Sequence, residues 1–163
     1  MDVHWNALDA NKRQCLNELE DKVDSGLELL KAQGLNPKIV GFFWMQGEGD
    51  ANPASRTATY YNYQKALMSE LRERYADYAV DGDIPFIDTE INNDGFWAAS
   101  YMINDAKNDI AEESGRNYII DSNYYGLTTR YENNDLAHYD STSMILLGQL
   151  YARKLCKIYN DFS

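Results

Sequence analysis

Residue types that mark redox, metal or membrane chemistry are scarce in this sequence. Only two cysteines occur, Cys15 and Cys156, and they stand near opposite ends without motif spacing, so neither a zinc site nor a disulfide framework is indicated. No run of about 18 apolar residues exists, which excludes a membrane-spanning helix. The localisation stays open, because secretion or export to a periplasm would require a signal peptide ahead of Met1.

Basic residues are also scarce relative to acidic ones. The chain carries 15 lysines and arginines against 26 aspartates and glutamates, a formal net charge of -11. An acidic surface repels other polyanions, so we expect neither nucleic acid nor an anionic membrane as a partner.

The composition that remains is typical of a globular protein. Of 163 residues, 44% are hydrophobic and 13% aromatic, which is enough to bury a core. No repeat, low-complexity tract or linker interrupts the chain. We therefore predict a single domain spanning residues 1–163.

Hydrophobic spacing predicts helices that alternate with short strands. Helices are predicted over Asp9–Gln33, from Asn52 to Tyr75, over Ala98–Ser114 and from Ser141 onward, and strands over Ile39–Met45, Ile84–Asp88 and Tyr118–Asp121. The inward residues are predicted to be Tyr60, Gln64, Leu67, Leu71 and Tyr75 in the second helix and Met144, Leu147, Tyr151, Leu155 and Ile158 in the last. This order predicts an α/β fold in which right-handed crossovers join parallel strands.

The strand at Ile39–Met45 ends abruptly in a polar turn. Its almost continuous apolar run predicts a strand buried on both faces of a parallel sheet, and Q-G-E-G-D follows at positions 46–50. Ligands of α/β folds bind at the carboxyl ends of strands. Glycines allow close backbone approach, and the amide and carboxylates offer polar contacts. We predict that this turn borders a functional site.

Two stretches resemble conserved blocks of the SGNH hydrolases, and among them of the sialate O-acetylesterase-like carbohydrate esterases. Residues 44–51 read W-M-Q-G-E-G-D-A and are similar to the third block, approximately W-x-Q-G-E-S-D-A, with Gly49 in place of the usual serine. Residues 135–138 read D-L-A-H and look like the terminal D-x-x-H block, with Leu147 and Gly148 following. Both blocks stand in the family's order, and the resemblance extends from Trp5 onward.

The resemblance implies a flavodoxin-like three-layer α/β/α sandwich with five parallel strands, of which the first two would lie upstream of Met1. Without them, the Ile39–Met45 strand would be an exposed apolar sheet edge, which folded proteins avoid. We therefore expect upstream strands or another subunit to cover this edge.

The candidate base is His138, one of only two histidines, predicted to lie in a loop just before the last helix. Asp135, three residues earlier, is close enough to orient the imidazole. By the resemblance these two residues are the acid and base of a catalytic triad.

The same resemblance assigns roles to the turn at positions 46–50. Gln46 would donate its side-chain amide to the developing oxyanion, and Gly47 would let the acyl group approach. Glu48 and Asp50 are expected to hold the turn, because acids after a strand commonly cap the next helix. The resemblance implies an acetylated carbohydrate as substrate, and no metal or cofactor.

The family's nucleophilic serine has no counterpart here. Family members begin with a strand that ends in Gly-Gln-Ser-Asn or Gly-Asp-Ser, and no such block occurs in the 163 residues, so we expect the chain to begin after it. Ser122, in I-D-S-N at positions 120–123, echoes the block, but the family has Asp-Ser or Asp-Thr at the end of this later strand. Ser122 is therefore expected to be structural, and Ser141 is expected to cap the last helix. No G-x-S-x-G elbow is present.

Three functional classes stay open. The first is a carbohydrate O-acetylesterase of the serine type, in which the isolated chain is inactive or nearly so. The second is a non-catalytic carbohydrate-binding or interaction domain derived from such an esterase. The third is a metal-dependent hydrolase that uses Glu48, Asp50, Asp135 and His138, although such sites usually carry more histidines.

Overall fold

A three-stranded parallel sheet forms the centre of the molecule. The computed structural model describes residues 1–52, 54–113, 115–130 and 134–160. The strands are β1 (Phe42–Trp44), β2 (Phe86–Thr89) and β3 (Asn117–Ile120), in the order β1-β2-β3. Phe42 pairs with Phe86, and Phe86 pairs with Asn117. The predicted parallel α/β arrangement is confirmed.

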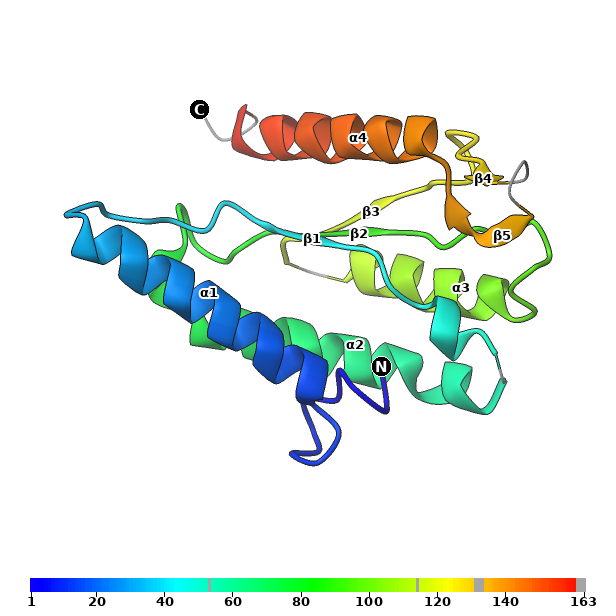
Figure 1. The fold of residues 1–163 in the computed structure, drawn as a ribbon, viewed down its shortest axis with the longest axis horizontal. Helices are drawn as coiled ribbons and strands as arrows, with labels where there is room; N and C mark the ends of the chain where they lie inside the picture. Colours follow the sequence, from blue (N-terminus) through cyan, green and yellow to red (C-terminus); the bar gives the residue numbers. More distant parts are fainter. Residues whose placement is uncertain (53, 114, 131–133, 161–163) are drawn as a thin grey trace.

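Helices cover both faces of this sheet (Figure 1). The helices are α1 (Gln14–Ala32), α2 (Ala54–Arg74), α3 (Ser100–Glu112) and α4 (Ser141–Asn160), with short 3-10 turns at η1 (Glu48–Asp50) and η2 (Ala76–Tyr78). In Figure 1, α4 lies on one side of the sheet and the other three helices lie on the opposite side. None of the helices in the described ranges combines the length and apolarity needed to cross a bilayer.

Two cores correspond to the two faces of the sheet. Successive residues of a strand point to opposite faces, so Phe86 joins the core under α1, α2 and α3, whereas Ile87 joins the core under α4. The predicted inward stripe of α2 is confirmed, because all five of its residues are at most 1% exposed: Tyr60, Gln64, Leu67, Leu71 and Tyr75. The stripe predicted for α4 is wrong at Met144, which is 46% exposed.

The first strand is shorter and more exposed than the sequence predicts. Hydrogen-bonded pairing is confined to Phe42–Trp44 and an isolated bridge from Ile39 to Ala79. Burial on both faces is wrong, since Phe43 is 47% exposed. Within the described residues β1 pairs with β2 alone, so β1 is an exposed edge of the sheet, as expected for the chain without further strands.

The N-terminal segment differs from its prediction for a local reason. The helix predicted from Asp9 begins only at Gln14. Before it, the side chain of Asn6 accepts from the Leu8 amide and that of Asp9 accepts from the Asn11 amide. Such side-chain to backbone bonds compete with helix formation, and they hold this segment in turns.

The D-L-A-H segment is a strand instead of the predicted loop. Residues of β5 (Asp135–Tyr139) pair antiparallel with β4 (Thr129–Arg130). The residue that caps α4 is Asp140, whose Oδ1 accepts from the Ser143 amide at 2.7 Å, so the capping role predicted for Ser141 is wrong.

Candidate active site

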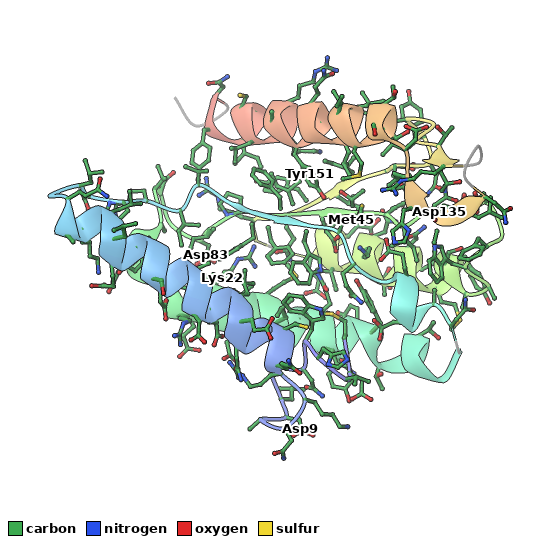
Figure 2. All side chains as sticks on the ribbon, viewed as in Figure 1. Asp9, Lys22, Met45, Asp83, Asp135 and Tyr151 are labelled. Carbon is green, nitrogen blue, oxygen red and sulfur yellow. The ribbon has the colours of Figure 1, made fainter. Side chains whose placement is uncertain are left out.

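Both segments singled out by the sequence lie beyond the carboxyl ends of the parallel strands. Figure 1 shows η1 and β5 at the same end of the molecule, and Figure 2 shows Met45 and Asp135 there. Burial raises the pKa of Tyr139 in β5, and the charge of Glu48 in η1 raises it further.

The turn after β1 is tied into the interior by hydrogen bonds. The Gln46 amide Nε2 donates to Asp50 Oδ2 at 2.7 Å, and the Tyr60 hydroxyl donates to the Gln46 carbonyl at 2.8 Å. Asp50 is only 4% exposed, so this carboxylate holds the turn in its conformation.

Gly47 occupies a position that other residues do not fit. Its φ is +146°, which side chains of L-residues rarely adopt, and a Cβ there would lie 2.6 Å from Cγ2 of Ile103. The backbone at Gly47 is buried between α3 and the sheet end. Glycine is therefore required for the turn to pack.

Asp135 and His138 contact each other directly within β5. His138 Nδ1 lies 3.1 Å from Asp135 Oδ1 and 3.0 Å from Oδ2. Asp135 Oδ1 also accepts from the backbone amides of Ala137 and His138, each at 3.1 Å. Partial burial raises the pKa of Asp135, but these hydrogen bonds outweigh it, and the pKa falls below its ordinary value.

This contact defines the state of the imidazole. A carboxylate at Nδ1 favours the tautomer with the proton on that atom, which leaves Nε2 free to accept a proton. The His138 side chain is 72% exposed, so Nε2 is accessible from outside. The arrangement is an exposed imidazole whose Nδ1 is held by one carboxylate of the same strand.

The family model for carbohydrate esterase, sialic acid-specific acetylesterase, matches residues 13–157. The chain belongs to this family. The match includes both sequence blocks and nearly every element of the fold. The resemblance that the two blocks indicate is thereby confirmed.

A solved structure agrees with this esterase family chain at the level of the fold. An Arabidopsis thaliana protein, determined by X-ray crystallography at 1.6 Å, superposes with a TM-score of 0.66 at 19% identity over 94% of this chain. This chain spans only 55% of that structure. A search of curated proteins gave no significant match.

Ser122 does not face the histidine of this esterase family chain. Its side chain is fully buried, donates to the Glu90 carbonyl at 2.8 Å and accepts from the Tyr139 hydroxyl at 3.0 Å. Neighbouring residues of a strand point to opposite sides, so Tyr139 and His138 face away from each other. The hydroxyl of Ser122 thus braces β5 from the side opposite His138.

The carboxylates of the metal alternative are engaged elsewhere. In the described ranges, no three His, Cys, Asp or Glu side chains form a group that could hold a metal ion. Asp50 accepts a hydrogen bond from Gln46, and Asp135 contacts His138. The four residues of that alternative therefore do not form one cluster in this esterase family chain.

A buried ion pair lies beneath the site, and the sequence does not predict it. Lys107 Nζ donates to Asp88 Oδ1 at 2.7 Å and to the Thr89 carbonyl at 2.6 Å, and Gln64 Nε2 donates to Asp88 Oδ2 at 3.2 Å. Burial raises the pKa of Asp88, and the Lys107 ammonium opposes that shift. Lysine is rarely buried, and a lone lysine in α3 gave no signal of this role.

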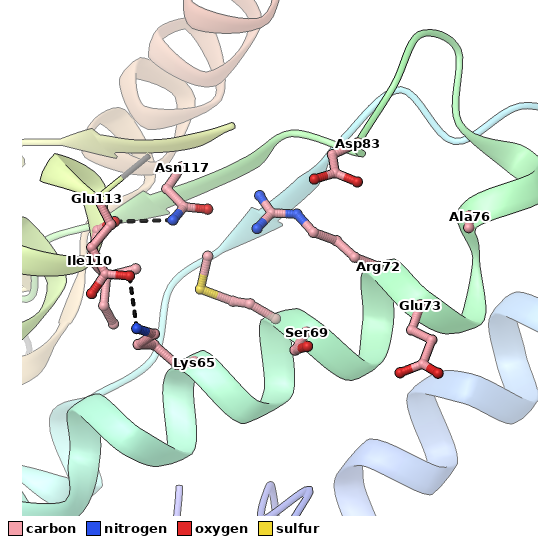
Figure 3. A pocket seen from close by; sticks show the side chains of 10 residues that line it. Lys65, Ser69, Arg72, Glu73, Ala76, Asp83, Ile110, Glu113 and Asn117 are labelled. Carbon is pink, nitrogen blue, oxygen red and sulfur yellow. Dashed lines mark hydrogen bonds and ion pairs between the residues drawn. The ribbon is translucent and has the colours of Figure 1, made fainter. Parts of the chain in front are cut away.

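A depression of about 430 Å³ lies at the opposite end of the sheet, near the amino ends of β2 and β3, and its two cations have partners within the chain (Figure 3). Lys65 lies 2.8 Å from Glu113, and Arg72 donates to the carbonyls of Ile84 and Arg116, each at 2.9 Å. These contacts fasten α2 to the sheet. We assign this depression a structural role.

Proposed function

We propose that this chain supplies the acid–base pair and the oxyanion turn of a carbohydrate O-acetylesterase that hydrolyses acetyl esters of sugars by serine chemistry. The observation that carries the proposal is the contact between Asp135 and His138 Nδ1, at the sheet end that also bears Gln46 and Gly47. Family membership supports the reaction class.

The proposed reaction uses His138 twice. Its Nε2 takes the proton of a serine hydroxyl while the serine oxygen attacks the acetyl carbonyl. The imidazolium then gives that proton to the sugar oxygen as its bond to the acyl carbon breaks. Water, deprotonated by the same nitrogen, releases acetate from the acyl-serine. Asp135, ionised because its pKa is lowered, stabilises the imidazolium.

Gln46 and Gly47 form the proposed oxyanion side. One N–H of the Gln46 amide is bound to Asp50, which fixes the amide and leaves its second N–H for the developing negative charge. Gly47 has no side chain to block the approach of the acyl group to the backbone. Glu48 and Asp50 hold this turn and take no part in proton transfer.

The serine nucleophile is proposed to come from residues beyond these 163, on strands that continue the sheet past β1. In this proposal the complete fold is a flavodoxin-like three-layer sandwich, and the chain is the C-terminal majority of one esterase domain. Three features support it: the exposed edge of β1, the 55% coverage of the solved relative, and two buried polar atoms, Trp44 Nε1 and Gln46 Oε1, that lack partners among the described residues.

A second candidate is a non-catalytic carbohydrate-binding domain derived from such an esterase. It is favoured by one observation: within the described residues, the His138 side chain hydrogen-bonds with Asp135 alone, and no serine reaches it. The two candidates differ in one respect: the esterase requires a further segment that carries the nucleophilic serine, and the binding domain does not.

The test is hydrolysis of 4-nitrophenyl acetate by the protein completed with its upstream coding sequence. We expect turnover that a serine-directed phosphonate abolishes and that EDTA leaves unchanged. The 163-residue chain alone should be nearly inactive, because a base and oxyanion donors without a nucleophile give only weak catalysis. Robust phosphonate-sensitive turnover by the isolated chain would contradict the proposal and point to Ser122, and EDTA-sensitive turnover would support metal chemistry.

A further inference from the structure

A groove at the edge of the sheet opposite β1 brings exposed tyrosines next to basic side chains. It has a volume of about 440 Å³ and runs between β3, the turn that follows it, and the second half of α4. We call it the basic groove, and its polar and aromatic lining consists of Asp121, Tyr124, Tyr125, Arg153, Lys154 and Lys157. Strands added beyond β1 would leave this edge uncovered, because β3 is at the other side of the sheet.

The two tyrosines stand on a hydrogen-bonded turn. The Tyr124 amide donates to Asp121 Oδ1 at 2.7 Å, and the Leu127 amide donates to the Ser122 carbonyl at 3.2 Å, which closes the turn. The rings of Tyr124 and Tyr125 pack edge to face with centroids 5.2 Å apart. They are nevertheless 80% and 46% exposed, so the turn presents a preformed aromatic surface to solvent.

The basic side chains of the groove are unusual in this acidic protein. The α4 sequence contains three cations within five positions, Arg153, Lys154 and Lys157, and no aspartate or glutamate. None of the three forms an ion pair or a side-chain hydrogen bond with the described residues. Asp121 is the only acid in the lining, and it is already bound to the Tyr124 amide.

The depression beside α2 provides the contrast. Its two cations have internal partners: Lys65 forms an ion pair with Glu113, and Arg72 donates to two backbone carbonyls. In a chain of net charge -11, three neighbouring cations without described partners form a local positive patch that attracts anions.

We propose that the basic groove is a binding site for acidic carbohydrate, a saccharide chain that carries carboxylate groups, separate from the candidate catalytic centre. Tyrosine offers an apolar ring face for sugar C–H groups and a hydroxyl for sugar hydroxyls. Arginine and lysine supply charge-assisted hydrogen bonds to carboxylates. A long nucleic acid fits less well, because tight phosphate binding takes more cations than three and the rest of the surface repels it.

The test is an NMR titration at low salt that measures binding of tri-galacturonic acid to the 163-residue chain. The neutral methyl ester of tri-galacturonic acid is the matched ligand. We expect the acid to shift resonances of the turn and α4 and the ester to bind at least about tenfold more weakly. Two double variants, Arg153→Ala/Lys157→Ala and Tyr124→Ala/Tyr125→Ala, should each bind the acid about tenfold more weakly than the wild type. Because no turnover is measured, the result is independent of the proposed esterase function.

The matched control is Lys22→Ala/Lys38→Ala, which removes the same charge from elsewhere on the surface and should leave the affinity unchanged. Equal weakening by this control would overturn the proposal, since it would show a non-specific charge effect. Equal affinity for the acid and its ester would also overturn it. Inorganic phosphate or oligothymidylate that binds as tightly as tri-galacturonate would show an unselective anion site or a nucleic-acid site instead.

Discussion

The two halves of the candidate active site are held in opposite ways. The Gln46–Asp50 turn is built into the interior: Asp50 is 4% exposed, the Tyr60 hydroxyl donates to the Gln46 carbonyl, and Ile103 packs against Gly47. The Asp135–His138 segment lies at the surface, with the His138 side chain 72% exposed and its orientation set mainly by one residue of the same strand.

This difference predicts different costs of mutation. A donor aimed at an oxyanion must be fixed before the reaction, and the buried turn provides that fixation through packing. A base must exchange protons with substrate and water, so exposure suits it and a local carboxylate is sufficient to orient it. Changes on the buried side should therefore unfold the chain, whereas changes on the exposed side should affect the reaction and leave the fold intact.

The largest loss of stability is expected from Lys107→Met, beneath the buried half. It leaves the carboxylate of Asp88 buried without its cation, and breaking such a pair costs about 3–5 kcal/mol. Urea unfolding followed by circular dichroism measures the loss. The double variant Asp88→Asn/Lys107→Met removes both charges and should recover much of the stability; a double variant as unstable as the single one would contradict this explanation.

A smaller loss is expected from Gly47→Ala. The added Cβ would lie 2.6 Å from Ile103 at a φ of +146°, and clash plus backbone strain cost about 2–4 kcal/mol. The control is Gly49→Ala, two residues away, where a Cβ meets nothing within 4 Å. The same urea series compares them, and equal unfolding midpoints would show that the turn is looser than described.

Asp140, which joins the exposed half to α4, should have an intermediate effect with a distinct pH dependence. Hydrogen bonds from the Thr128 hydroxyl and the Ser143 amide lower the pKa of Asp140 from its ordinary value of 3.8. Its stabilising contribution is therefore complete above that value and is lost as the pH falls below it. Asp140→Ala should lower stability at pH 7 by about half the Gly47→Ala loss. The difference from the wild type should shrink toward pH 3 in urea titrations, and a difference that does not vary with pH would refute the capping role.

The smallest change in stability is expected at the exposed half itself. His138→Ala removes a side chain that is 72% exposed, so the urea midpoint should stay at the wild-type value within error. Thermal unfolding provides the second measurement. A large destabilisation would mean that His138 is a structural residue, and the contrast between the two halves would fail.

Much of the fold follows from patterns that are local in sequence. The inward stripe of α2 is visible as a helical spacing of large residues, and all five positions are buried. The order of strands and helices follows from the alternation of short apolar runs with helical periods. Elements whose state depends on a partner strand could not be predicted: β5 forms because β4 offers it a pairing edge, and no pattern within D-L-A-H indicates a strand.

The candidate site was predictable only where residue type limits the chemistry. His138 stands out because histidines are rare here, and Asp135 because it stands at the D-x-x-H spacing before it. The buried pair of Asp88 and Lys107 did not stand out, because charged residues usually lie at the surface and nothing in the local sequence marks an exception. The cap of α4 by Asp140, instead of Ser141, depends on a loop conformation that the sequence leaves undetermined.

The most direct test of the central claim measures kcat/KM for 4-nitrophenyl acetate with the completed protein. Two variants are compared, each with one of the two histidines of these 163 residues replaced. The account predicts that His138→Ala lowers kcat/KM by about 1,000-fold or more while His4→Ala, at an exposed position near the N-terminus, leaves it unchanged. Wild-type kcat/KM in His138→Ala, or equal losses in both variants, would contradict the assignment of His138 as the base.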